Sequence, residues 1–127
     1  IISMEGDMRP SPNSPSMVSR AVCALLNERI QGQPMAFTQL YKFFQQARAT
    51  ERRLREGEPF AAIIAELVAL QPKAAVIVGR DVAPRCFKDF IDANVGLARE
   101  SEHAFRQGFL QHYQAVLCYY RYFNRAR

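Results

Sequence analysis

The residues of this chain that could carry acid–base or nucleophilic chemistry are few, and their spacing does not suit that chemistry. His103 and His112 are the two histidines. At ~100° per residue, His112 falls on the apolar stripe of a helix, which favours a satisfied, half-buried imidazole. Cys118 follows six residues later, about 240° around the same helix, so the two side chains cannot share a proton or a metal ion. The spacing therefore predicts no catalytic pair.

Metal and phosphate-loop chemistry is equally unsupported. Four residues could be proposed as zinc ligands: Cys86, His103, His112 and Cys118. They do not include the two ligands close together in sequence that zinc sites usually have. Gly79–Arg80 lacks the glycine run and the Lys-Ser/Thr of a phosphate-binding loop. Asp89 and Asp92 are neighbours on the surface of an expected helix. Two carboxylates exposed to solvent account for this pair without a catalytic role. We predict no catalytic residue, no metal site and no cofactor, and hence no enzyme.

Basic side chains gather on one predicted helix, from about Phe37 to Glu56. Four residues face away from its apolar stripe: Lys42, Gln46, Ala49 and Arg53. Four more lie on the flank: Tyr41, Arg48, Arg52 and Arg55. Such a surface can follow phosphates without reading bases. Three acids lie within reach of these arginines: Glu51, Glu56 and Glu58. The spacing alone fits a phosphate-binding face and a salt-bridged, solvated face equally well.

The end of the chain is rich in aromatic residues. Tyr113, Tyr120 and Phe123 fall on the apolar stripe of the last predicted helix, and Tyr119 and Tyr122 face outward. RNA stacking is one interpretation of such a surface. Core packing plus a protein contact is the one we prefer, with Tyr119 and Tyr122 facing a partner or solvent.

These segments must be positioned by helices, because helical spacing dominates the chain. Gly6, Pro10 and Pro12 interrupt the start, so residues 1–14 are expected to form a flexible arm, followed by a single helical domain over residues 15–127. Local signals then mark helix boundaries: Ser14–Pro15, Gly57, Pro59, Pro84 and the cap Ser101.

One segment, Pro72–Arg80, is ambiguous. Its apolar stretch Ala74–Val78 by itself could be a buried strand, but the sequence offers no second strand to pair with it. We therefore predict an all-α fold, a compact bundle of five or six helices.

The composition of the chain excludes several classes of protein. The chain has 127 residues, 49% hydrophobic and 23% charged, which excludes a disordered or collagen-like protein. It has no run approaching the ~20 apolar residues of a membrane span. It also begins without a signal segment, so Cys23, Cys86 and Cys118 are expected as reduced thiols in the cytoplasm.

The net charge is +5, with 17 basic residues against 12 acidic ones. The basic surplus lies after residue 40, and all but three of the cations are arginines. Arginine suits bidentate contact with phosphate, although a coding bias towards Arg and Ala would leave the same signature. The charge alone does not decide whether the chain binds nucleic acid.

Three segments together resemble the small subunit of type III-A CRISPR effector (Csm) complexes. The first is the helix-borne run Thr38-Gln39-Leu40-Tyr41-Lys42-Phe43-Phe44, with Tyr41 where the family usually has Arg. The second is Leu70–Arg80, in which Pro-Lys precedes Gly-Arg by six residues, with Val76 where the family often has Tyr. The third is the aromatic segment Phe105–Tyr119. Their order and spacing agree over roughly residues 35–123.

The resemblance implies a non-catalytic helical subunit, helical also over Pro72–Arg80. In that setting two or more copies stack along the complex and contact its backbone and large subunits. They hold guide RNA paired with target RNA through the sugar-phosphate backbone, while cleavage belongs to other subunits. The residues then expected to bind RNA are Lys42, Arg48, Arg52, Arg53, Lys73 and Arg80. Tyr119 and Tyr122 are expected to contact other subunits. The alternative hypothesis is a helical protein-interaction module that forms a homodimer and has no direct RNA role.

Overall fold

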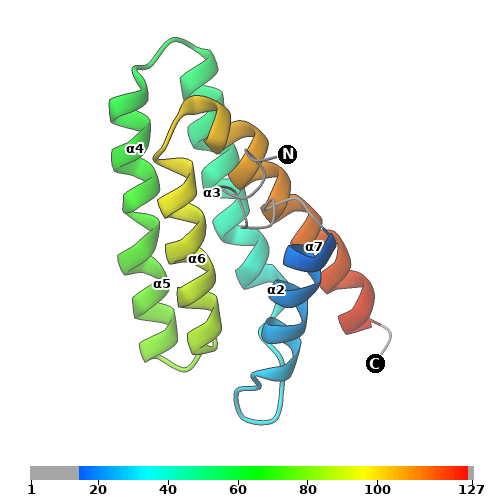
Figure 1. Cartoon of the computed structure of the whole chain (residues 1–127). Helices are drawn as coiled ribbons and strands as arrows, with labels where there is room; N and C mark the ends of the chain where they lie inside the picture. The colour runs from blue at the N-terminus through cyan, green and yellow to red at the C-terminus, as the bar shows by residue number, and fades with distance from the viewer. Residues whose placement is uncertain (1–14, 126–127) are drawn as a thin grey trace, which may run out of the picture.

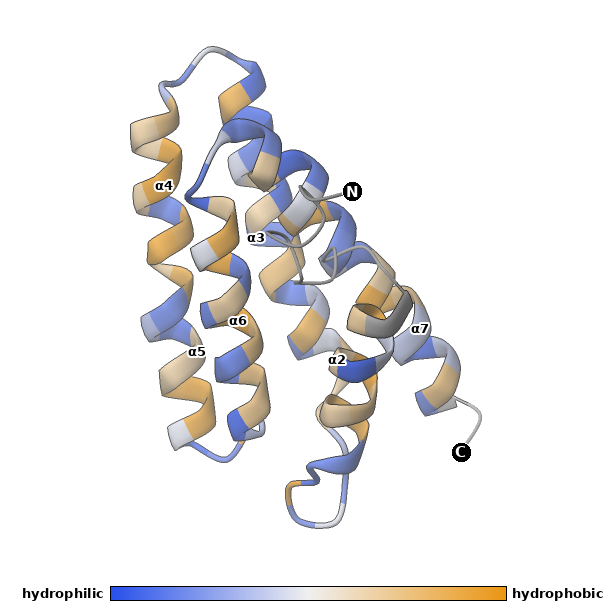
Figure 2. Ribbon diagram, viewed as in Figure 1, coloured by the Kyte–Doolittle hydropathy of each residue, from blue (hydrophilic) through white to orange (hydrophobic). Residues whose placement is uncertain are grey.

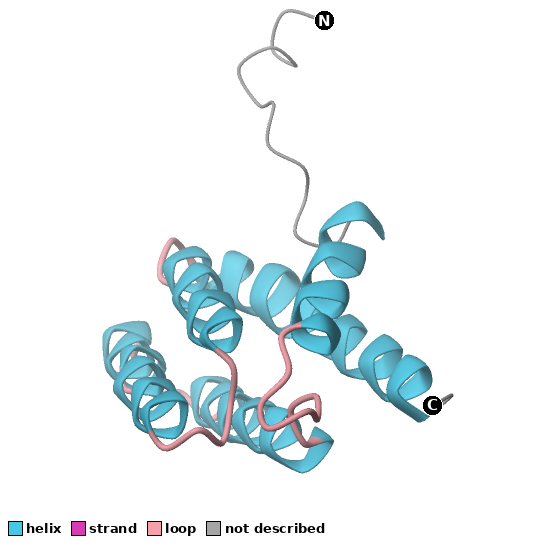
Figure 3. Cartoon of the chain, turned by 90° about the horizontal axis from the view of Figure 1, so that it is seen from below, coloured by secondary structure: helices cyan, strands magenta, loops and turns pink. Residues whose placement is uncertain are grey.

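The chain folds into helices joined by short loops, as Figures 1 and 3 show for the computed structural model, which describes residues 15–125. No strand occurs within that range. The helices are α2 (Pro15–Asn27), α3 (Phe37–Arg55), α4 (Phe60–Val68), α5 (Leu70–Gly79), α6 (Arg85–Ala98), the π-helix η1 (Ala104–Leu110) and α7 (Gln111–Arg125). The all-α prediction is confirmed. The arm expected over residues 1–14 lies outside the described residues.

The boundaries of α3 follow from local chemistry. Ala36, in extended conformation (φ −64°, ψ 134°), precedes its first turn. At the other end Gly57 adopts a φ of +106°, a left-handed conformation that favours glycine, and its N–H donates to the Leu54 carbonyl at 3.1 Å. The predicted stop at Gly57 is confirmed, and the turn reverses the chain into α4.

Helices α4 and α5 form one continuous rod, because Ala69 between them keeps helical dihedral angles (φ −65°, ψ −17°). The rod covers Phe60–Gly79, about 30 Å at 1.5 Å per residue. The ambiguous segment Pro72–Arg80 is therefore helical up to Gly79. The rod runs antiparallel to α3, with α6 beside it (Figure 1).

The rod is long and apolar enough to cross a membrane by length and composition, with a mean hydropathy of 1.8 and 22% of that span buried. The sequence has no unbroken apolar run of that length, since Glu66, Gln71 and Lys73 interrupt it. Each of these three side chains binds a neighbouring helix of the bundle: Glu66 and Lys73 bind α3, and Gln71 binds Asp92 of α6. Figure 2 shows mostly apolar colouring along both α4 and α5.

The last helical run begins where the sequence predicts. The Ser101 hydroxyl accepts a hydrogen bond from the Ala104 N–H at 2.9 Å, as an N-cap does. The run then winds as the π-helix η1 before continuing as α7, which the residue spacing did not predict. Phe105 and Phe109 are nevertheless fully buried.

Two tyrosines of α7 tie this last run to the start of α3. The Tyr113 hydroxyl donates to the Leu40 carbonyl at 2.7 Å, and the Tyr120 hydroxyl donates to the Met35 carbonyl. Both rings are fully buried, and burial raises the pKa of Tyr113 well above its usual value. Phe123, which the sequence placed on the same buried stripe, is 47% exposed. It lies in the last turns of α7, where its ring packs only on Tyr119 and Tyr122 among the described rings.

Candidate RNA-binding surface

The surface that could bind RNA is the open side of α3, which packs between α4 and α7. Its exposed middle consists of Lys42, Gln45, Arg48, Ala49 and Arg52, which we call the α3 ridge. The one acid of α3, Glu51, does not face it. Its side chain is 14% exposed, and its carboxylate binds Arg55 at 3.1 Å and Arg106 at 3.7 Å. The ridge therefore has three cations and no carboxylate.

Arg53 has a different environment from the ridge. Its guanidinium binds Glu58 through Nε and through Nη2 (2.8 Å to Oε1), and Nη1 lies 2.9 Å from Glu66 Oε1. These hydrogen bonds raise the pKa of Arg53 and lower the pKa of Glu58. Of the two interpretations of the basic helix, the salt-bridged face fits Arg53. Its side chain joins α3 to the turn before α4 and to α4 itself.

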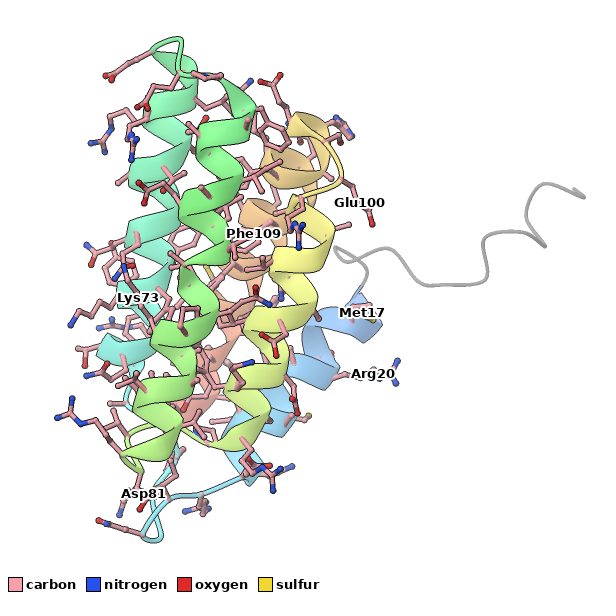
Figure 4. All side chains as sticks on the ribbon, turned by 90° about the vertical axis from the view of Figure 1, so that its left-hand side faces the viewer. Met17, Arg20, Lys73, Asp81, Glu100 and Phe109 are labelled. Atoms are coloured by element: carbon pink, nitrogen blue, oxygen red, sulfur yellow. The ribbon has the colours of Figure 1, made fainter. Side chains whose placement is uncertain are left out.

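The edge between α3 and the α4–α5 rod has a regular register. Arg53 of α3 binds Glu66, and seven residues earlier Gln46 accepts a hydrogen bond from Lys73 Nζ at 3.1 Å, seven residues after Glu66. A step of seven keeps a side chain on the same flank of a helix. Figure 4 shows Lys73 on the side of the rod next to α3.

Of the six cations expected to bind RNA, the structure therefore brings four together. Lys42, Arg48 and Arg52 lie on the α3 ridge, and Lys73 lies beside it through Gln46. Arg80 is exposed at the far end of the rod, where it is the C-cap of α5. Arg53 lies on the same edge, but two carboxylates hold its guanidinium.

The other flank of α3 borders an open groove of about 530 Å³ between α3 and α7. It is lined by Phe37, Tyr41, Phe44, Arg48, Gln114, Leu117, Cys118, Arg121 and Tyr122. Arg121 lies over the ring of Phe37 at 4.8 Å, and Arg48 lies over Phe44 at 5.7 Å. The aromatic pattern at the chain's end does not reveal this groove, because four of its nine lining residues come from α3.

The residues predicted to contact other subunits are well exposed. Tyr119 is 54% exposed and Tyr122 is 66% exposed. Phe123 lies between them, with ring centroids 6.5 Å from Tyr119 and 5.0 Å from Tyr122. These three rings form an aromatic cluster at the end of α7, larger than the sequence predicted because Phe123 belongs to it.

A second surface that sequence reasoning missed is the outward side of the α4–α5 rod. Its members are uncharged and mostly small, and we call them the rod face: Ala61, Ala65, Val68, Pro72, Ala75 and Val76. All but Val68 are exposed, and Val76 is 55% exposed. The signal that could have found this surface is the mean hydropathy of the segment, with its charges all on the flank facing α3.

The histidines and cysteines form no site in the described residues, where no group of three His, Cys, Asp or Glu could hold a metal ion. His112 is buried beside Phe90, with ring centroids 5.9 Å apart. Cys118 is exposed in the groove, and Cys23, Cys86 and Cys118 are all free thiols. Asp92 accepts hydrogen bonds from Lys88 of its own helix (2.6 Å) and from Gln71 of α5 (3.0 Å), so this carboxylate links α6 to α5.

Comparison with known families agrees with the resemblance noted above. A family model described as Csm2 Type III-A matches residues 17–126, nearly all of the described chain. No curated protein and no solved structure matches the chain. The match covers the α2–α7 bundle from Met17 onward, including the α3 ridge and the groove. The chain therefore belongs to the Csm2 Type III-A family and is a small subunit of a type III-A CRISPR effector complex.

Proposed function

We propose that this subunit is non-catalytic, that it binds guide RNA and the target RNA paired with it through the sugar-phosphate backbone, and that it bridges neighbouring subunits. The observation that carries the RNA proposal is the α3 ridge. Its cations Lys42, Arg48 and Arg52 are exposed on a helix whose one carboxylate is already bound by Arg55 and Arg106. From Lys42 to Arg52 the ridge itself offers phosphate no carboxylate, and Glu56, the exposed C-cap of α3, lies one turn beyond Arg52.

The dimensions of the ridge suit several phosphates. Lys42 and Arg52 are ten residues apart, about 15 Å along the helix. A nucleic-acid strand carries one charge per ~3.4 Å of helix axis, so the ridge spans about four nucleotides. Lys73 and Arg80 extend the positive charge along the adjacent edge. Positive charge without a fixed pattern of base contacts gives binding without sequence preference, which a subunit holding guides of varied sequence requires.

The proposal that the chain is non-catalytic is supported by the position of its acid–base candidates. His112 is buried against Phe90, and Cys118 is exposed in the groove between α3 and α7. Asp92 is held by Lys88 and Gln71. His112 and Asp92 are thus held by structural neighbours, and Cys118 lies apart from both. These side chains form no acid–base pair.

Charge reversal on the α3 ridge tests the RNA proposal. We expect Lys42→Glu with Arg52→Glu to weaken binding of two guide–target duplexes of unrelated sequence by at least about tenfold, equally for both. The slope of log Kd against log salt concentration should fall by roughly one per cation removed. The matched control is Arg85→Glu with Arg99→Glu, which reverses two exposed arginines of α6 and its C-cap. Equal loss in the control, or an unchanged affinity and salt slope on the ridge, would contradict RNA binding by α3.

Bridging of neighbouring subunits is proposed for the aromatic cluster of α7 and the rod face. Both are exposed apolar surfaces on an otherwise charged domain, and such surfaces are typical of protein contacts. They also favour the second candidate function, a homodimeric interaction module without an RNA role. Light scattering combined with a gel shift separates the two functions. A dimer that shifts no guide–target duplex at low salt would favour the module and contradict the RNA proposal.

A further inference from the structure

Backbone binding at Arg48 and subunit contact at Tyr122 explain only part of the lining of the groove between α3 and α7. It is open and measures about 530 Å³, within the range of small-molecule sites. Its walls combine three rings of α3 with two guanidiniums, those of Arg48 and Arg121, and no carboxylate. A ligand that suits it presents both a flat ring and a negative charge.

The rings and cations of the groove are already arranged for stacking. Phe37 and Tyr41 are parallel within 11°, with centroids 5.8 Å apart, and Tyr41 is 41% exposed. Arg121 lies over Phe37 and Arg48 over Phe44, so each guanidinium is held against the wall by a cation–π contact. Their charges consequently stay at the groove instead of extending into solvent.

The groove is continuous with the α3 ridge, because Arg48 belongs to both. A strand whose phosphates follow the ridge passes the mouth of the groove at this residue. A nucleotide there has its phosphate near Arg48 and Arg121 and its base within reach of Tyr41. An aromatic or acidic side chain of another protein would match the rings or the cations, but a nucleotide matches both.

We propose that this groove holds one nucleobase, unpaired and out of the base stack, of the RNA that follows the α3 ridge, with its ring on Tyr41 and its neighbouring phosphates at Arg48 and Arg121. The inference rests on the proposed RNA binding by α3. Every base offers a π face, so the site accepts any base, in keeping with binding that ignores sequence. Gln114, whose amide both donates and accepts, can meet different base edges at the rim.

Tyr41 and an RNA lacking bases together test this inference. We expect Tyr41→Ala to weaken binding of a single-stranded RNA about tenfold, within the range reported by alanine substitution for one stacked base. Tyr41→Phe keeps the ring and should bind as the parent does. An abasic strand of the same length should bind the parent chain and Tyr41→Ala equally, because it has no base to stack. A thermal melt of Tyr41→Ala confirms that the fold is retained.

Cys118 provides an independent readout, since it lines the groove, whereas Cys23 is exposed outside it. Alkylation by iodoacetamide, followed by mass spectrometry, should slow at least about fivefold at Cys118 when the parent chain is saturated with the single-stranded RNA. The rate at Cys23 should stay unchanged in the same sample. The abasic strand should protect Cys118 markedly less.

The outcomes separate the two proposals. If both strands bind equally, protect Cys118 equally and ignore Tyr41→Ala, the nucleobase site is wrong while backbone binding by α3 stands. If Tyr41→Ala leaves RNA affinity intact but releases the other effector subunits during purification, the groove holds a protein side chain and the inference is overturned. If neither strand binds the parent chain, the inference fails, and the duplex measurements on the ridge variants decide separately whether RNA binding by α3 stands.

Discussion

At the scale of single residues, the same side-chain type has different roles according to its neighbours. Arg52 and Arg53 are consecutive, yet Arg52 faces solvent on the α3 ridge and Arg53 binds two carboxylates. The sequence places Glu58 near Arg53, so that contact was among the alternatives. Glu66 was not, because it approaches Arg53 only after α3 and α4 fold back on each other. Contacts between residues of different helices are the part of the site that spacing cannot supply.

The cysteines show the same dependence on surroundings. Burial, followed by the charges of Glu28 and Asp89, raises the pKa of Cys86 to about 12. Its thiol donates to the Ala24 carbonyl at 3.4 Å, and its backbone N–H donates to Glu28 Oε1 at 2.9 Å. Cys86 is therefore held as a thiol, whereas Cys23 is exposed on α2.

We expect iodoacetamide at pH 8 to modify Cys86 roughly a hundredfold more slowly than Cys23, because the thiolate is the reacting form. Mass spectrometry of the native chain over time measures both rates at once. Urea should bring the two rates together, since unfolding removes the burial. Equal rates in the native chain would show that Cys86 is not held in the environment described.

At the scale of elements, the helix boundaries were readable because their signals are local. Gly57 ends α3, Pro59 and Pro84 precede α4 and α6, and Ser101 caps the last run. The sequence was a poorer guide to which apolar side chains are exposed. Phe123 shares the apolar spacing of Tyr113 and Tyr120 but lies beyond the elements that cover them. The rod face has apolar composition, and composition does not say which side of a helix another helix covers.

The salt bridges of Arg53 with Glu58 and Glu66, which we call the brace, join α3 to α4 and give a prediction at this scale. Arg53→Gln should lower the thermal stability of the bundle at pH 7 while leaving RNA affinity within about twofold, unlike Lys42→Glu with Arg52→Glu. The pKa of Glu58 is lowered in the folded chain, so the brace stabilises the fold above the unfolded pKa, about 4.3. That stabilisation is lost as the pH falls through the folded pKa of Glu58.

Thermal melts of the parent and Arg53→Gln at pH 7 and pH 3 check this prediction. The difference between their midpoints should be larger at pH 7 than at pH 3, because protonation of Glu58 as the pH falls removes its ion pair with Arg53. A loss of RNA affinity as large as that of the ridge variant would instead place Arg53 among the phosphate ligands.

At the scale of the whole molecule, the bundle keeps its charges and its apolar surfaces apart. The α3 ridge and Lys73 carry exposed cations, the rod face is uncharged, and the aromatic cluster ends α7. Such a division suits a part that meets RNA on one side and proteins on others. The all-α fold and the Csm2 Type III-A membership were both accessible from sequence motifs. The groove was not, because it exists only where α3 and α7 cross.

Contact between α3 and RNA in the assembled effector complex can be tested by ultraviolet crosslinking. The complex is purified through a tagged copy of this chain, and the crosslinked peptides are mapped by mass spectrometry. We predict crosslinks in Phe37–Arg55, including Tyr41, to guide–target RNA of varied sequence. Crosslinks confined to α6 and the rod, or none in a complex that retains its guide RNA, would contradict it.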